Sequence, residues 1–160
     1  MNIKRSQSEK GFTLIEILVV IAIIAILAAI VIVAINPAKR FQDARNSQRH
    51  ANVEAILGAM QQQMIDKKGI FTCEGVILPD TVATAAEISN TGIDIAPCLS
   101  DYLAIFPVDP GSATVAAGTW TNVDTYNTKY TIWQATSTKQ ITITAPTASS
   151  DGGGTISITR

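Results

Sequence analysis

The most apolar part of the chain is a continuous run near its N-terminus. Residues 17–35 contain no polar residue, no glycine and no proline. As an α-helix, at about 1.5 Å per residue, this run would be roughly 28 Å long, close to the roughly 30 Å of a bilayer's hydrocarbon core. The run continues past the small residues Ala28 and Ala29, unlike a secretory signal, which is shorter and ends at a cleavage site. The pattern therefore predicts a helix that can span a membrane.

The next segment has apolar residues on one side only, which is typical of a helix that packs one face on a core. Gly69 is a plausible stop, so the pattern predicts that the helix continues to about Lys68. Asn36 and Pro37 interrupt it, because proline removes a backbone hydrogen bond. The apolar residues recur at spacings of three and four: Val53, Ile56, Leu57, Met60 and Met64.

Past Gly118 the apolar positions alternate with threonine and serine, which indicates half-buried antiparallel strands. Before them, we expect short helices at residues 81–89 and 100–106, between turn signals. The whole pattern predicts an α+β fold, in which a long N-terminal helix packs its amphipathic second half on a small antiparallel sheet. The alternating pairs are Tyr130 and Ile132, Ile141 and Ile143, and Ile156 and Ile158.

Composition changes this picture little. The chain has 160 residues and a formal net charge of −1, and outside the apolar run it is long enough for one modest core. Lysine and arginine flank the apolar run on both sides, so counting them does not decide which flank faces the cytoplasm. The single histidine, His50, lies on the predicted helix, and we find no nucleophile, base and orienting group, so an enzyme is not expected.

The two cysteines, Cys73 and Cys98, lie far apart in the sequence. With one distant histidine they cannot supply a zinc site. A disulfide between them would close a loop of about 26 residues and stabilise the fold by about 3.5 kcal/mol, which would place this part outside the cytoplasm. The alternative is two buried thiols in a cytoplasmic domain.

Glu16 is an ionisable residue beside the apolar run, where charge is costly and usually has a partner. Its spacing from Thr13 fits a capping box, in which the acid serves the first turn of the helix. From these residues alone, Glu16 can serve as this local cap or can pair with a charged group of another molecule.

The stretch KGFTLIE, residues 10–16, followed by the aliphatic run, resembles the class III leader of type IV prepilins and type II secretion pseudopilins. The resemblance implies that a prepilin peptidase cuts between Gly11 and Phe12 and methylates the new N-terminus at Phe12. It also implies that Glu16, then the fifth residue, is needed for assembly. The leader would face the cytoplasm, and the rest would lie outside, first as a single-pass membrane protein and then in a filament.

This resemblance divides the chain into a leader (1–11), a membrane and filament-core helix (12–36), an amphipathic helix (37–68), an αβ-loop region (69–110) and a sheet (111–160). It implies partners of four kinds: copies of the chain or related pilins in a helical filament, the peptidase, an inner-membrane assembly platform, and membrane lipid. Family members commonly have a proline where this chain has Val33, with Pro37 four residues later. In the family this proline accompanies a locally melted part of the helix. Because the proline is displaced here, the resemblance does not imply whether the helix melts near Val33 to Pro37, or at which residue.

The sequence FPVDP, residues 106–110, resembles an element of major pseudopilins but lacks the Trp-Gly that often follows it. Those proteins bind calcium in sheet loops, so Asp101, Asp109 and Asp124 are weak calcium candidates. Loop aspartates are more often solvated turn formers, and we expect no cofactor.

A basic stretch follows the apolar run. We interpret it as a solvated or intersubunit face rather than a nucleic-acid site, because aromatic residues are not interleaved and Asp43 lies within it. Contact with lipid headgroups is a further alternative. The cations of this basic stretch are Lys39, Arg40, Arg45 and Arg49.

The predicted function is a structural subunit of a type IV pilus or pseudopilus. An alternative within the class is a minor pseudopilin of a type II secretion or DNA-uptake system. An alternative of another class is a membrane-anchored extracellular binding module.

Overall fold

The structure is a computed structural model that describes residues 11–160. The predicted leader lies outside the described residues except for Gly11. The described residues divide into two units, one that ends at Arg40 and one that comprises Phe41–Arg160.

The first unit contains the helix α1 (Leu14–Ile35). Thr13 caps its N-terminus, and the helix ends at Asn36, which has a left-handed conformation with φ of 47° before Pro37. It is long and apolar enough to cross a membrane. The predicted helix and its interruption at Asn36 and Pro37 are therefore present.

A second helix, α2 (Pro37–Asp66), runs into the globular unit. The predicted apolar stripe is confirmed, since its first four members are fully buried and Met64 packs against them from a half-buried position. The helix ends at Asp66, two residues earlier than predicted. Lys68 and Gly69, which follow it, both have positive φ and so cannot continue the helix.

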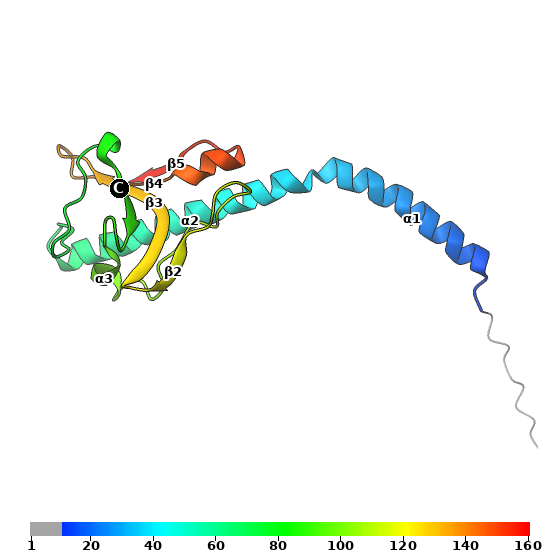
Figure 1. The fold of residues 1–160 in the computed structure, drawn as a ribbon, viewed down its shortest axis with the longest axis horizontal. Coiled ribbons are helices and arrows are strands. Elements are labelled where there is room, and N and C mark those ends of the chain that lie inside the picture. The colour runs from blue at the N-terminus through cyan, green and yellow to red at the C-terminus, as the bar shows by residue number, and fades with distance from the viewer. Residues whose placement is uncertain (1–10) are drawn as a thin grey trace, which may run out of the picture. The chain divides into compact units, whose positions relative to one another are not determined.

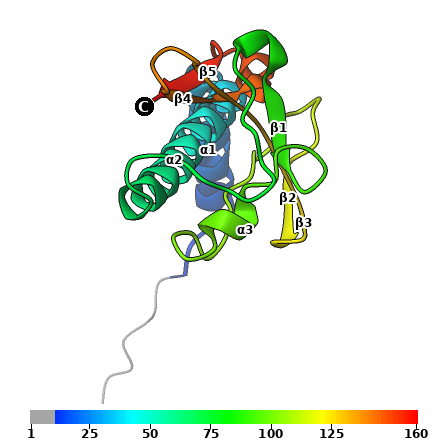
Figure 2. The same cartoon turned by 90° about the vertical axis from the view of Figure 1, so that its left-hand side faces the viewer.

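Five strands form one antiparallel sheet with the order β1-β3-β4-β5, and β2 pairs with β3. Figures 1 and 2 show the strands along one side of α2 in the globular unit. The predicted α+β fold is confirmed, with three strands at the alternating segments. The strands are β1 (Ala86–Ser89), β2 (Thr119–Asn122), β3 (Thr125–Gln134), β4 (Ile141–Ala145) and β5 (Ile156–Thr159).

The core lies between α2 and the sheet. Alternate side chains of β3 are buried, as period-two patterning requires for a strand with one face on a core. The aromatic rings of Phe106, Trp120 and Tyr126 pack together, with centroids 5.6–5.9 Å apart, and Trp120 packs against the core. The buried residues of the strands include Ile88, Tyr126, Tyr130, Ile132, Ile141 and Ile143.

The two short helices predicted between α2 and the sheet were placed wrongly. Residues 81–89 contain only a 3₁₀ turn, η1 (Val82–Thr84), and then strand β1, because β1 finds its hydrogen-bond partners on β3. The other short helix is α3 (Ala96–Leu99), which lies before the predicted segment and has proline in its first turn. A further 3₁₀ helix, η2 (Pro146–Asp151), connects β4 to β5.

Candidate functional site: the N-terminal segment and a buried ionic cluster

The chain just before α1 is fully accessible. Phe12 is 85% exposed, and space is open around Gly11, where an added Cβ would meet nothing within 4 Å. The Gly11–Phe12 peptide bond precedes the first residue of α1 and is not part of a helix or strand. An enzyme can therefore reach this bond without unfolding the helix.

Glu16 and Thr13 form a complete capping box at the start of α1. The Glu16 carboxylate accepts hydrogen bonds from the backbone N–H and the hydroxyl of Thr13, both at 2.8 Å, and the Glu16 N–H donates to the Thr13 hydroxyl at 3.3 Å. These bonds satisfy backbone donors that helix ends leave without partners. They also hold the carboxylate one turn from Phe12, so the local role predicted for Glu16 is present.

The surface of α1 is apolar and exposed along its length, with no buried residue. Its large side chains are about half to nine-tenths exposed, from 48% for Val19 to 91% for Leu14. Exposed apolar surface of this extent needs lipid or other apolar helices around it, because contact with water costs free energy in proportion to area. The helix therefore fits insertion in a membrane.

A cluster of buried charges connects α2 to two loops of the globular unit. Arg49 has no exposed surface, and its guanidinium donates to Asp109 from Nε at 2.9 Å and from Nη2 at 3.2 Å. It also donates to Asp151 at 2.7 Å, to the carbonyl of Gly111 at 2.6 Å and to the Asn46 side chain at 2.7 Å. All of these acceptors are oxygens, and through them one cation connects α2 to two other segments, the loop of Asp109 and Gly111 and the 3₁₀ helix that ends at Asp151.

The loop that holds Asp109 depends on Gly111. Its φ is +75°, and a Cβ there would lie 2.7 Å from the backbone nitrogen of Ala117, so only glycine fits. Its N–H donates to Asp109 at 2.7 Å, while its carbonyl accepts from Arg49. Thr147, at the start of η2, donates to the other oxygen of Asp109 at 2.8 Å. The carboxylate of Asp109 is therefore fully satisfied inside the protein.

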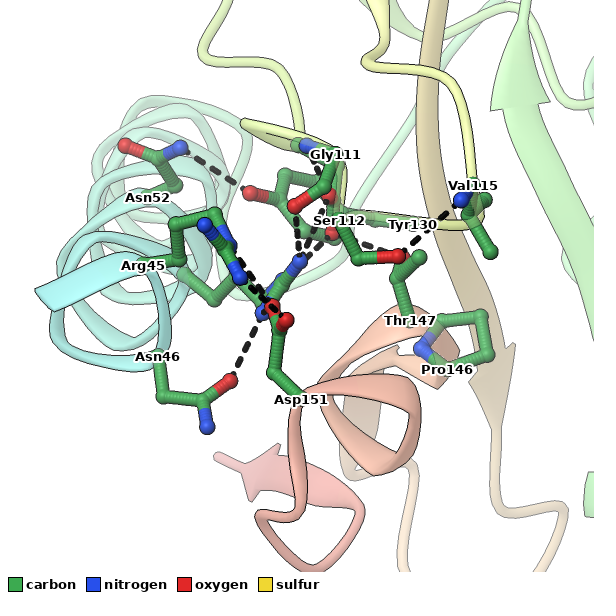
Figure 3. Close-up of polar contacts among 12 residues, drawn as sticks. Arg45, Asn46, Asn52, Gly111, Ser112, Val115, Tyr130, Pro146, Thr147 and Asp151 are labelled. Carbon is green, nitrogen blue, oxygen red and sulfur yellow. Dashed lines mark hydrogen bonds and ion pairs between the residues drawn. The ribbon is translucent and has the colours of Figure 1, made fainter. Parts of the chain in front are cut away.

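Arg45 lies one turn before Arg49 and donates to Asp151 through two nitrogens, at 2.9 and 2.5 Å. Figure 3 shows Arg45 and Asn46 projecting from α2 toward Asp151 on η2. The hydrogen bonds from Arg45, and then those from Arg49, hold the pKa of Asp151 at about 2, below its usual 3.8. Asp151 is therefore ionised throughout the neutral and mildly acidic range.

This arrangement predicts that the globular unit loses stability as the pH falls from about 4 toward 2. The unfolded chain binds a proton at Asp151 near pH 3.8, whereas the folded chain resists protonation until about pH 2, so acid favours unfolding in that interval. We expect a loss on the order of 2 kcal/mol from this group. The measurement is urea unfolding of the full chain in non-ionic detergent at several pH values. Asp151→Asn should show a shallower decline, and parallel curves for the two proteins would contradict the prediction.

Cys73 and Cys98 form a disulfide, with their Cα atoms 5.6 Å apart. It ties the loop after α2 to the short helix α3, which contains Cys98. A hollow of about 550 Å³ lies beside it, with Glu74, Val76 and Ile77 among its lining residues. The predicted pairing is thus present. It crosslinks the region between α2 and β2, which has little regular secondary structure.

The three weak calcium candidates do not come together. Asp109 is buried against Arg49, Asp101 is exposed just after α3, and Asp124 lies in the turn between β2 and β3. In the part of the chain that the structure describes, no group of three or more His, Cys, Asp or Glu residues could hold a metal ion. A cation already occupies the position at Asp109, and it is a guanidinium.

The interpretation of the basic stretch was wrong for half of its members. Arg45 and Arg49 turn into the globular unit and pair with aspartates there, whereas Lys39 and Arg40 are exposed. The sequence offered no local signal for this, because Asp109 and Asp151 lie 60 and 102 residues from Arg49. His50 is exposed, as expected for a surface position on the helix.

Comparison with known proteins gives one match. Residues 6–32 match the family described as the prokaryotic N-terminal methylation motif. No curated protein and no solved structure gives a significant match. The matched residues include the Gly11–Phe12 bond, the capping box and most of α1. The chain is therefore a prepilin-like protein that carries, over these residues, the class III leader and N-methylation motif found in type IV pilins and pseudopilins.

Proposed function

We propose that the chain is a structural subunit of a type IV pilus or pseudopilus filament, matured by cleavage after Gly11 and N-methylation of Phe12. The observation that carries the proposal is an accessible Gly11–Phe12 bond just before a capped helix that is apolar except for one acid in its first turn. Residues 1–11 are then the leader, residues 12–36 the membrane and filament-core helix, and the remainder an amphipathic helix with its globular head.

The proposed orientation places the leader in the cytoplasm and the globular unit outside. The disulfide between Cys73 and Cys98 supports this direction, because disulfides persist in oxidising compartments. In the membrane, α1 would be surrounded by lipid. After extraction by an assembly platform, the α1 helices of neighbouring copies would replace the lipid and form the apolar centre of the filament.

In this proposal Glu16 has a second role after cleavage. The new α-amine of Phe12 is a cation at a helix N-terminus, where the helix dipole gives it no stabilisation. The carboxylate of Glu16 in a neighbouring copy can pair with it, and apolar surroundings strengthen that attraction. A wrong axial register would leave both charges buried without partners, so the pair selects one register. The capping box would hold the carboxylate until the neighbour arrives.

The direct test is the N-terminus of the protein made with its own prepilin peptidase. We expect mass spectrometry to find a chain that begins with N-methyl-phenylalanine at Phe12. Gly11→Leu should leave the leader attached, because the peptidases of this family cut after glycine. Gly154→Leu is the control, because Gly154 lies in the globular unit and a Cβ added there meets nothing within 4 Å. An intact Met1 in the wild-type protein would favour the membrane-anchored extracellular binding module instead.

The motif is shared by major and minor subunits of pili, secretion systems and DNA-uptake systems. Labelling of filaments with an antibody to the globular unit separates these alternatives. Label along the whole shaft indicates a major subunit, and label only at the tips indicates a minor one.

A further inference from the structure

The first turn of α2 contains two cations, Lys39 and Arg40, shortly after the end of α1. Both side chains are exposed, and neither forms an ion pair with any residue between 11 and 160. Arg45 and Arg49, which follow on the same helix, are held by buried aspartates. Of the four cations in this stretch, two therefore form ion pairs within the globular unit, and the other two can bind an outside partner.

The distance from α1 places these two cations at the depth of lipid headgroups. Lys39 is four residues beyond Ile35, or about 6 Å at the helical rise. The interfacial region extends roughly 5–8 Å beyond the hydrocarbon core on each side, because whole bilayers are about 40–45 Å thick and their cores about 30 Å. When α1 spans the core, the ends of both side chains reach this layer, and long basic side chains adjust their depth readily.

The backbone around Asn36 holds this turn in a defined shape. The Asn36 side chain accepts a hydrogen bond from the Lys39 N–H at 3.4 Å, and its carbonyl accepts from the Arg40 N–H at 3.3 Å. The partial positive charge at the start of α2 adds to that of the two side chains. Asp43 is the nearest acid along the helix and pairs with neither cation within the described residues. The turn therefore presents a local excess of positive charge.

We propose that Lys39 and Arg40 bind the phosphate groups of anionic phospholipids while α1 lies in the membrane. This inference rests on the proposed membrane insertion and adds a lipid-binding site to it. A phosphodiester can accept a two-nitrogen contact from the Arg40 guanidinium and a point-charge contact from the Lys39 ammonium. Because α1 connects this site to Glu16, lipid binding also sets the depth of Glu16 at the opposite end of the helix before assembly.

The test uses the full-length chain in mixed micelles that contain equal amounts of phosphatidylglycerol and phosphatidylcholine, followed by native mass spectrometry of the retained lipid. A basic residue at a membrane surface favours anionic lipid by about fivefold, so the double variant Lys39→Gln/Arg40→Gln should lower the phosphatidylglycerol preference by roughly 10- to 30-fold. The matched control is Lys67→Gln/Lys68→Gln, just past the other end of α2, which should keep the wild-type preference. Leader cations are the same in every variant.

An unchanged phosphatidylglycerol preference in the Lys39→Gln/Arg40→Gln variant would overturn the proposal. If that variant also gave less chemical crosslinking between copies than the wild-type protein, the two cations would belong to a contact between subunits instead. The lipid measurement is made on unassembled protein. Glu16→Gln, designed to stop assembly, should retain the lipid preference, so failure of the filament proposal and failure of this one give different results.

Discussion

Replacing Arg49 with methionine is expected to lower the free energy of unfolding by about 3–5 kcal/mol, since it leaves a buried carboxylate without its cation. Arg49 is fully buried and makes both of its contacts with Asp109 inside the protein. Asp151 would keep Arg45, but Asp109 would keep only the neutral donors Thr147 and Gly111. Methionine fills a similar length without supplying a charge, so the effect reports the lost cation rather than a large cavity.

The measurement is urea unfolding of the full-length chain in non-ionic detergent, followed by near-ultraviolet circular dichroism of the packed aromatic residues. Arg40→Met is the matched control, because Arg40 is exposed on the same helix, and it should change stability by no more than about 0.5 kcal/mol. Adding Asp109→Asn to Arg49→Met should recover part of the loss, because the stranded charge is removed. A loss below about 1 kcal/mol for Arg49→Met would show that the cluster is not the main connection between α2 and the loops.

The second large effect is expected at Glu16, where Glu16→Gln should reduce filament yield at least tenfold without changing insertion or cleavage. Glutamine can still accept the two hydrogen bonds from Thr13, so the local cap remains while the charge is lost. An unpaired amine buried between copies costs several kcal/mol, and about 1.4 kcal/mol already corresponds to a tenfold change in an equilibrium. Filament yield is measured by shearing and immunoblotting, and cleavage by the mass of the membrane-bound protein.

Thr13→Val is the control that separates the two roles of Glu16. It removes the capping hydroxyl, which donates to Glu16 at 2.8 Å, and leaves the acid in place. We expect nearly normal filaments from it, because loss of a cap costs only about 1 kcal/mol in a helix of 22 residues that its surroundings also stabilise. Normal filaments from Glu16→Gln, or equal defects in both variants, would show that Glu16 acts only as a cap.

The N-terminal part of this protein could be predicted because its signals are local. A capping box depends on residues three apart, a helix that can span a membrane on one uninterrupted run, and the N-terminal methylation motif on one continuous stretch, residues 6–32. The apolar stripe of α2 and the alternation in β3, β4 and β5 are also periodic over short stretches. Each of these features could therefore be recognised without knowing what lies opposite it.

The sequence predicts helix where strand β1 lies, because a four-residue segment has little preference of its own and takes the structure that its neighbour β3 offers. From the sequence, Asp109 is a candidate calcium ligand, because the sequence of a loop does not reveal whether an acid in it binds water, a metal ion or an arginine. Its partner lies 60 residues earlier, on a helix whose four cations look alike in the sequence.

The sequence by itself determined the apolar helix, the N-terminal methylation motif that includes most of it, and the helix-on-sheet class of the fold, because those depend on composition and period along the chain. Only the tertiary structure decided which cations of α2 form buried ion pairs and which remain exposed to bind another molecule. Burial of Arg49 is favourable only where Asp109, Asp151 and the Gly111 carbonyl converge on it, and that convergence exists only after distant segments have folded together.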